Sequence, residues 1–152
     1  MKKIASFQVD HTKLDIGIYI SRIDDDVVTY DVRMTIPNAG CYMEPAAMHT
    51  IEHLFATYAR NTKYEKNILY IGPMGCRTGF YLLTRNLPHD KAIEIIQESM
   101  QFILNYEGEI PGASKVECGN YLEHDLEKAK NAVRPLVAKI KDYTVEMLQY
   151  NK

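Results

Sequence analysis

The chain has 152 residues, of which 46% are hydrophobic and 25% charged, and its formal net charge is −2. A chain of this size and balance can close one hydrophobic core, so we expect a single domain over residues 1–152. The small net charge gives no reason to expect nucleic acid or an anionic membrane as a partner, and no apolar run reaches the roughly 18 residues that span a bilayer. The N-terminus lacks the apolar stretch of a secretory signal, and three cysteines do not make a disulfide framework, so a cytoplasmic protein is expected.

The first third of the chain alternates apolar and polar residues with the period of two that is typical of β-strands. Three runs show this pattern, at residues 3–9, 16–22 and 27–35. The aspartates at 24–26 predict a tight turn between the second and third runs. Further strands are expected over residues 67–71 and 80–84. Residues 72–79, which lie between them, hold three glycines and are expected to form an irregular loop.

Three later segments indicate helices. Pro45 suits the first turn of a helix, and an apolar stripe at helical spacing follows it. A second helix is expected over residues 88–105. A third is expected after residues 118–120, with Asn120 as its N-cap and Pro135 breaking or kinking it. This order of elements predicts a single α+β domain, with an antiparallel sheet packed against helices.

His49, Glu52 and His53 form the most informative pattern in the chain. On a helix, positions i, i+3 and i+4 share one face, so the three side chains converge. Two imidazoles are natural ligands of a divalent transition metal, and a carboxylate beside them can move protons. The pattern is the inverted form of the zinc-peptidase signature. The alternative is a helix that merely carries two surface histidines.

A catalytic metal site usually takes a third protein ligand and leaves one position for water or substrate. The candidates are Cys118, His124, Glu117, Glu123 and Glu127. Cys118 is favoured because it sits beside Gly119 at an expected loop-to-helix junction, where a helix N-terminus stabilises a thiolate. Its alternative role is that of a small buried hydrophobic residue. His124 is expected to lie on a helix surface.

Cys76 is the second chemical lead. It lies in the glycine-rich loop beside Arg77, and a neighbouring cation lowers the pKa of a thiol. Such a thiolate can act as a nucleophile or as an acid–base group, while a plain turn cysteine is the alternative. Cys41 has no such context and is expected to be inert. His11 lies in a polar turn and carries little weight alone, whereas Arg33 lies in a strand, which is unusual for a cation unless it is paired or faces a ligand.

Several segments, in one consistent order, resemble those of a known family. They are Ser6-Phe7, Asp10-His11-Thr12, Asp31-Val32-Arg33, Pro37-Asn38, the motif from His49 to Leu54, Gly72-Pro73-Met74-Gly75-Cys76-Arg77-Thr78-Gly79-Phe80-Tyr81 and Glu117-Cys118-Gly119-Asn120-Tyr121. They are similar to the S-ribosylhomocysteine lyase family (LuxS), and the resemblance covers residues from about 6 to about 130. It implies cleavage of S-ribosylhomocysteine to homocysteine and 4,5-dihydroxy-2,3-pentanedione, the autoinducer-2 precursor, by carbonyl migration and β-elimination.

The resemblance also implies roles for individual residues. His49, His53 and Cys118 would hold one metal per subunit, Fe²⁺ with Zn²⁺ or Co²⁺ able to substitute, and a water would take the fourth position. Cys76 and Glu52 would be the two acid–base groups. The substrate pocket would be lined by Ser6, His11 and Arg33. The family is a homodimer with its active sites at the interface, so the N-terminal turn would reach the site of the partner subunit.

Two features depart from the family pattern. Tyr70 stands six positions before Cys76, where many members carry an acidic residue that holds the homocysteine amino group; a main-chain carbonyl would have to serve instead. The tail beyond Lys130, with Pro135, also fits the family less well.

Two other classes of function remain as alternatives. In an inverted-motif metallopeptidase, Glu52 would activate water and Glu123 or Glu127 would be the third ligand, which leaves Cys76 and Cys118 without a role. A non-enzymatic metal sensor would need closed coordination by four ligands, with His124 as a candidate for the fourth.

Overall fold

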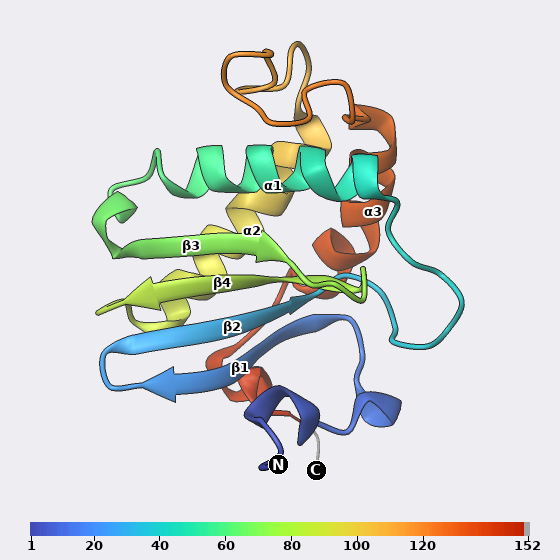
Figure 1. Cartoon of the computed structure of the whole chain (residues 1–152). Helices are drawn as coiled ribbons and strands as arrows, with labels where there is room; N and C mark the ends of the chain where they lie inside the picture. The colour runs from blue at the N-terminus through green and yellow to red at the C-terminus, as the bar shows by residue number, and fades with distance from the viewer. Residues whose placement is uncertain (151–152) are drawn as a thin grey trace.

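Four antiparallel strands form one sheet in the computed structural model, which describes residues 1–150 (Figure 1). From one edge to the other they are β1 (Gly17–Asp24), β2 (Val27–Arg33), β4 (Gly79–Arg85) and β3 (Ile68–Pro73). Asp25, at φ 53°, permits the tight turn between β1 and β2, since aspartate tolerates the left-handed region. β2 and β4 pair without a register shift, from Val27 opposite Arg85 to Arg33 opposite Gly79. The predicted hairpin and antiparallel sheet are confirmed.

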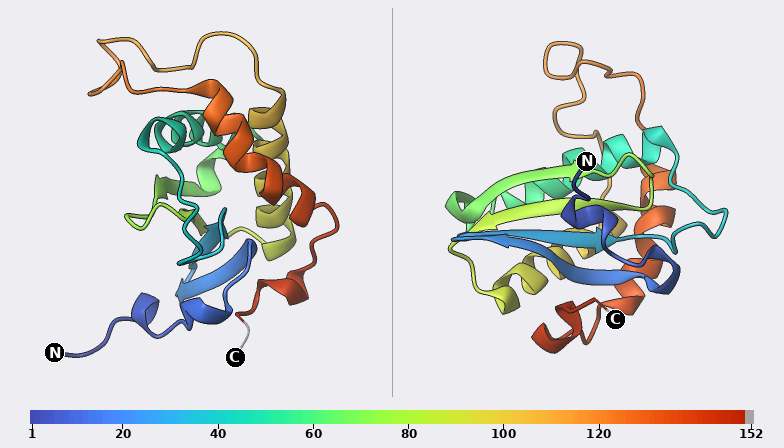
Figure 2. Two further views of the ribbon diagram at one scale, coloured as in Figure 1. Left: turned by 90° about the vertical axis from the view of Figure 1, so that its right-hand side faces the viewer. Right: turned by 60° about the horizontal axis from the view of Figure 1, so that its bottom comes forward.

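Three helices pack against one another and against the sheet. They are α1 (Pro45–Ala59), α2 (His89–Asn105) and α3 (Leu126–Lys139). In Figure 1, α1 runs along β3 while α2 and α3 lie behind the sheet, and the turned views of Figure 2 agree. The core between the layers includes Phe55 of α1, Phe80 of β4 and Ile96 of α2, each fully buried. The α+β prediction is therefore confirmed. No helix within residues 1–150 is long and apolar enough to cross a membrane.

The strand predicted over residues 3–9 is wrong. That segment holds a short 3₁₀ turn, Ala5–Phe7, and a second such turn, His11–Lys13, follows it. Ile4 and Phe7 are 56% and 66% exposed, so the apolar side chains that suggested a strand do not pack against the core. Without a buried face the alternating pattern cannot select a strand. The segment lies beyond β1, at the edge of the sheet opposite to α1 (Figure 1).

The start predicted for the third helix is also wrong. α3 begins at Leu126, and its N-cap is Asp125, whose carboxylate accepts the main-chain N–H of Lys128, instead of Asn120. Residues 106–125 are irregular, and we call them the Cys118 loop. The break expected at Pro135 does not occur, because α3 continues to Lys139. Pro135 is exposed, so water can satisfy the carbonyl that its missing N–H leaves free.

The glycine-rich loop is shorter than predicted. β3 runs to Pro73 and β4 begins at Gly79, so only residues 74–78 form the connection, which we call the Cys76 turn. Gly79 packs directly against β2, where an added Cβ would lie 2.6 Å from the Val32 carbonyl oxygen. The close approach of these strands fixes the base of the Cys76 turn.

Candidate metal centre and active site

Helix α1 presents two imidazoles whose orientation is fixed by carbonyl groups. The Nδ1–H of His49 donates to the Glu123 carbonyl at 2.8 Å, and that of His53 donates to the Pro111 carbonyl at 2.9 Å. A carbonyl only accepts, so each Nδ1 must carry the hydrogen, and each Nε2 keeps its lone pair free. A hydrogen bond from the other ring nitrogen to a carbonyl group commonly orients a metal-binding histidine.

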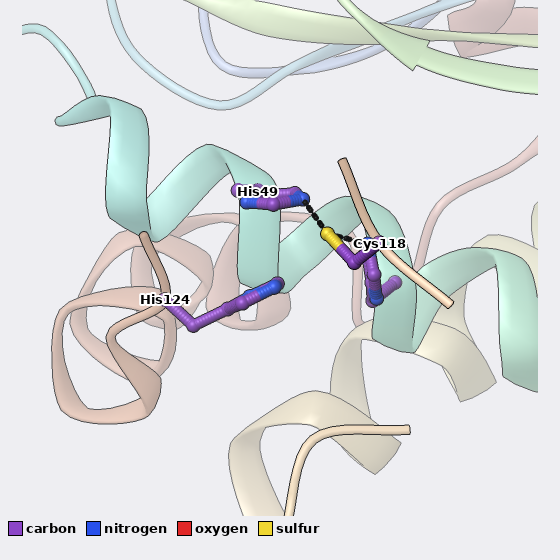
Figure 3. A group of neighbouring side chains, drawn as sticks. His49, Cys118 and His124 are labelled. Carbon is purple, nitrogen blue, oxygen red and sulfur yellow. Dashed lines mark hydrogen bonds between the residues drawn. The ribbon is translucent and has the colours of Figure 1, made fainter. Parts of the chain in front are cut away.

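Cys118 joins this pair from the loop between α2 and α3. Its Sγ lies 3.3 Å from His49 Nε2 and 4.0 Å from His53 Nε2, and Figure 3 shows the sulfur pointing toward the imidazole of His49. The expectation that Cys118 marks a helix N-terminus is wrong, since α3 begins at Leu126. The thiol is placed by its loop, where its main-chain N–H donates to the Ser114 carbonyl.

His124 also belongs to this group, and the prediction of a helix-surface residue is wrong. It is half-buried, precedes α3, and its ring stacks on that of His49 with centroids 3.9 Å apart (Figure 3). One ligand atom from each of His49, His53, Cys118 and His124 lies within 4.8 Å of the others. Burial, and then the charges of His49 and His53, lower the pKa of His124 to about 4. Nothing in the spacing of the sequence distinguished this histidine from a surface residue.

The four side chains fit a divalent transition metal. Imidazole nitrogen and thiolate sulfur are the donors that Zn²⁺ and Fe²⁺ accept in proteins, and the two α1 histidines already point their lone pairs at the thiol. The chain therefore carries a His/His/Cys/His group whose ligand atoms lie close enough together to hold one metal ion, and we call it the metal-binding group. A peptidase-type site would require a glutamate as a ligand, and among the described residues no glutamate belongs to this group.

Glu52 and His53 line one cavity of about 540 Å³ next to this group. Tyr70 of β3 and Gly112 of the Cys118 loop lie on its other walls. The Tyr70 ring crosses over Gly72, where an added Cβ would lie 2.3 Å from the phenol oxygen. The structure thus places Glu52 beside the metal-binding group and Tyr70 on the same cavity.

Cys76 sits on a second cluster of polar groups, at the end of the central strands. Its Sγ lies 3.0 Å from the Thr78 hydroxyl, which accepts a hydrogen bond from Arg33 Nη1 at 2.7 Å. When Cys76 is a thiolate its sulfur can only accept, so the Thr78 hydroxyl then donates its hydrogen to the sulfur. Burial raises the pKa of the Cys76 thiol, but the hydrogen bonds from Thr78 and the charge of Arg33 outweigh it and lower the pKa overall. The cation that acts on this thiol is Arg33 and not the sequence neighbour Arg77, which lies over the Tyr42 ring.

Arg33 is held by a buried ion pair. It is 2% exposed, and its Nε and Nη2 donate to the two oxygens of Asp31, at 3.1 and 2.6 Å. The Tyr150 hydroxyl donates to the same carboxylate at 2.7 Å, and the Tyr150 ring stacks on Tyr19. Arg33, the cation that was unusual within a strand, is therefore paired with a carboxylate. Its remaining nitrogen, Nη1, faces the Cys76 turn.

The N-terminal residues predicted to line the site lie elsewhere in this chain. His11 Nδ1 is 2.9 Å from the Val9 carbonyl, and among the described residues neither Ser6 nor His11 has a hydrogen bond to the metal-binding group or to Cys76. The 3₁₀ turns that carry them, Ala5–Phe7 and His11–Lys13, lie beyond β1, while α1 lies along β3 (Figure 1). Cys41 is exposed and remains outside both clusters.

The fold and the two clusters define a small α+β metalloenzyme with a thiol of lowered pKa. Residues 4–147 match the family described as S-ribosylhomocysteinase (LuxS), and the chain belongs to this family. A protein named S-ribosylhomocysteine lyase from Borreliella afzelii is 46% identical over 99% of both chains. A protein of the same name from Finegoldia magna is 49% identical over 86% of both chains. Another, from Clostridium acetobutylicum, is 43% identical over 99% of both chains.

Proposed function

We propose that this protein cleaves S-ribosylhomocysteine to homocysteine and 4,5-dihydroxy-2,3-pentanedione. The observation that carries the proposal is the convergence of Cys118 on His49 and His53, in a chain that is 46% identical over 99% of its length to a protein named S-ribosylhomocysteine lyase. The pentanedione is the precursor of autoinducer-2, so the family implies a part in quorum sensing beside the recycling of methyl-cycle products. We propose that the reaction takes place in the cytoplasm, with no membrane or nucleic acid involved.

The reaction needs both acid–base groups and a Lewis acid. The substrate thioether at C5 of the ribose is a poor leaving group with no acidic proton beside it. Moving the carbonyl from C1 to C2 and then to C3 makes the C4 proton acidic, and its removal expels homocysteine thiolate by β-elimination. Each migration takes a proton from one carbon and returns one to its neighbour, so no oxidant or reductant is consumed. A bound metal supplies polarisation of the sugar oxygens.

The residues of this chain suit these steps. His49, His53 and Cys118 would hold one Fe²⁺ per subunit, with Zn²⁺ or Co²⁺ able to substitute, because imidazole and thiolate bind all three. Cys76, with its lowered pKa, would carry protons in one phase of the migration, and Glu52, on the cavity beside His53, in the other.

The substrate residues are proposed on the same grounds. Arg33 would line the substrate pocket through Nη1, the nitrogen that lies 4.0 Å from Cys76 Sγ. Ser6 and His11 lie at the far edge of the sheet from α1, so they would reach a site only in a homodimer whose active sites lie at the interface. Tyr70 lines the cavity beside Glu52, so it is a candidate for holding the substrate amino group.

The test is homocysteine release. Anaerobically purified protein loaded with Fe²⁺ is incubated with S-ribosylhomocysteine, and free thiol is titrated over time. We expect steady release that is lost in Cys76→Ala and in Glu52→Gln, while both variants still bind metal. The absence of release from a fully loaded wild-type protein would exclude the lyase reaction, and the peptidase and metal-sensor alternatives would then be tested with a peptide substrate and by metal affinity.

A further inference from the structure

His124 differs from the other two histidines of the metal-binding group in what its Nδ1 contacts. His49 and His53 each place Nδ1 against a carbonyl oxygen, which forces the hydrogen onto Nδ1. His124 instead places Nδ1 3.0 Å from the Thr50 hydroxyl oxygen. A hydroxyl can donate or accept, so the proton position on His124 depends on the other partners of Thr50.

Those partners make Thr50 the donor. The Thr50 oxygen already accepts the main-chain N–H of Asp125 at 3.0 Å. Thr50 is 0% exposed, so water cannot take its hydrogen, and His124 Nδ1 is the only acceptor that its hydroxyl meets among the described residues. If Nδ1 carried a hydrogen, two donors would face the Thr50 oxygen and the buried hydroxyl hydrogen would lack an acceptor, which is unfavourable for a buried polar group. The hydrogen of neutral His124 therefore lies on Nε2.

This Nε2 is a buried atom without a partner. Among residues 1–150 it has no hydrogen bond, although its surroundings exclude solvent. One ring nitrogen of His124 lies within 4.8 Å of the ligand atoms of His49, His53 and Cys118, and Figure 3 shows the nitrogen end of its ring pointing toward Cys118. A protonated Nε2 has no lone pair for a metal, whereas it is a hydrogen-bond donor.

We propose that His124 is not a fourth metal ligand but a neutral hydrogen-bond donor, whose Nε2–H meets an oxygen of the sugar substrate in the site. The inference rests on the proposed lyase function for the identity of that oxygen. Negative charge develops on the sugar oxygens at each carbonyl migration, and a fixed donor in a buried site stabilises such charge. It also leaves three protein ligands and one open position, which is the arrangement of a catalytic rather than a structural metal site.

The proton position can be read directly from the wild-type protein. Protein labelled with ¹⁵N in its histidines is loaded with Zn²⁺ alone, and the tautomer of each ring is assigned from long-range ¹H–¹⁵N spectra. We expect His124 to carry its hydrogen on Nε2, and His49 and His53 to carry theirs on Nδ1. A hydrogen on Nδ1 of His124, with Nε2 shifted by the metal, would overturn the proposal. This result does not depend on any turnover, so it stands or fails separately from the lyase reaction.

Two variants test the donor role. His124→Phe keeps the ring that stacks on His49 and removes both nitrogens, and His124→Gln returns an amide N–H near the place of Nε2. We expect His124→Phe to keep the Co²⁺ absorption spectrum and to raise the Co²⁺ dissociation constant by no more than about 100-fold, the range of an outer-sphere effect. Its kcat should fall by roughly 10²–10³-fold, as for the loss of an oxyanion donor, and His124→Gln should recover part of that loss.

The opposite results are equally distinct. A dissociation constant weakened more than about 100-fold, beyond the range of an outer-sphere effect, together with a changed Co²⁺ spectrum, would make His124 a ligand. An unchanged kcat in His124→Phe with unchanged metal binding would leave the histidine a packing residue. Each outcome overturns the proposal.

Discussion

At the scale of single residues, the reactivity of Cys76 depends on the orientation of one hydroxyl. Thr78 accepts from Arg33 and donates to the Cys76 sulfur, so it passes the effect of a buried cation to an exposed thiol. A hydrogen bond to the charged form of a group favours that form, which for a thiol means a lower pKa. The pKa of Cys76 therefore depends on Thr78, a residue two positions further along the chain.

Thr78→Val removes this hydroxyl and keeps the side-chain shape. Because the Thr78 hydrogen bonds lower the pKa of Cys76, we expect the pKa to rise and the thiolate fraction at neutral pH to fall. The rate of alkylation by iodoacetamide, followed against pH in a metal-loaded Cys41→Ser background, should then reach its midpoint at higher pH. Thr78→Ser retains the hydroxyl and serves as the control. An unchanged midpoint in Thr78→Val would show that Thr78 does not stabilise the thiolate.

The sequence revealed some of these residues and concealed others for physical reasons. Helical spacing alone placed His49, Glu52 and His53 on one face, because that relation is local. The strand position of Arg33 indicated a partner, and Asp31 on the same face supplies it. His124 was named as a candidate ligand but was expected on a helix surface, because its position depends on how the Cys118 loop folds back over α1, which no local pattern encodes. The choice of Arg33 over Arg77 as the partner of Cys76 is likewise a tertiary contact.

At the scale of elements, regular segments with a buried face were predictable and segments without one were not. The bounds expected for α2 differ from the observed ones by one residue, because its apolar residues repeat at helical spacing. Residues 3–9 have a strand-like pattern but no buried face. The start of α3 was misplaced because asparagine and aspartate are both good N-caps, so the sequence could not choose between Asn120 and Asp125. In the fold the main-chain N–H of Asp125 donates to the Thr50 hydroxyl, and this tertiary contact favours Asp125.

The hairpin of β3 and β4 depends on a glycine at its base. Gly79→Ala would place a Cβ 2.6 Å from the Val32 carbonyl oxygen and force β4 away from β2. We expect a loss of unfolding free energy of about 1–3 kcal/mol, as for other overpacked sites, measured by urea denaturation. Gly75→Ala is the matched control, because its Cβ meets no atom within 4 Å, and we expect a change of about 0.5 kcal/mol or less. Equal effects of both variants would argue against the steric explanation.

At the scale of the whole molecule, the last described residue closes onto the sheet. The Tyr150 hydroxyl donates to Asp31, which is 1% exposed and holds Arg33. Tyr150→Phe leaves one oxygen of a buried carboxylate with a hydrogen bond fewer. We expect a loss of unfolding free energy of about 1.5–3 kcal/mol, the range for hydrogen bonds to charged groups. Tyr121→Phe is the control, because Tyr121 is exposed and its hydroxyl has no hydrogen bond within residues 1–150, so we expect little effect on the unfolding free energy. An equal loss of unfolding free energy in both variants would argue against a particular contribution of Tyr150.

The metal-binding group joins a rigid part of the molecule to a loosely packed one. His49 and His53 lie on α1, whose inner face is in the core, whereas none of residues 106–125 is fully buried. Polar contacts hold the Cys118 loop to α1, among them the hydrogen bonds of His49 to Glu123 and of His53 to Pro111. Bound metal would add a direct link from Cys118 to both histidines and would stabilise the loop in proportion to its affinity.

Removal of the metal should therefore loosen the loop and spare the fold. We expect amide hydrogen exchange, compared between Zn²⁺-loaded and chelator-treated protein, to become faster across residues 106–125 and to stay unchanged in β2 and β4, whose side chains form the core. Cys118→Ser in the presence of Zn²⁺ should show the same local pattern, because it weakens the link without a chelator. Faster exchange throughout the sheet would mean that the metal supports the whole fold, as in zinc-dependent small domains. Unchanged exchange in the loop would mean that the polar contacts alone hold it on α1.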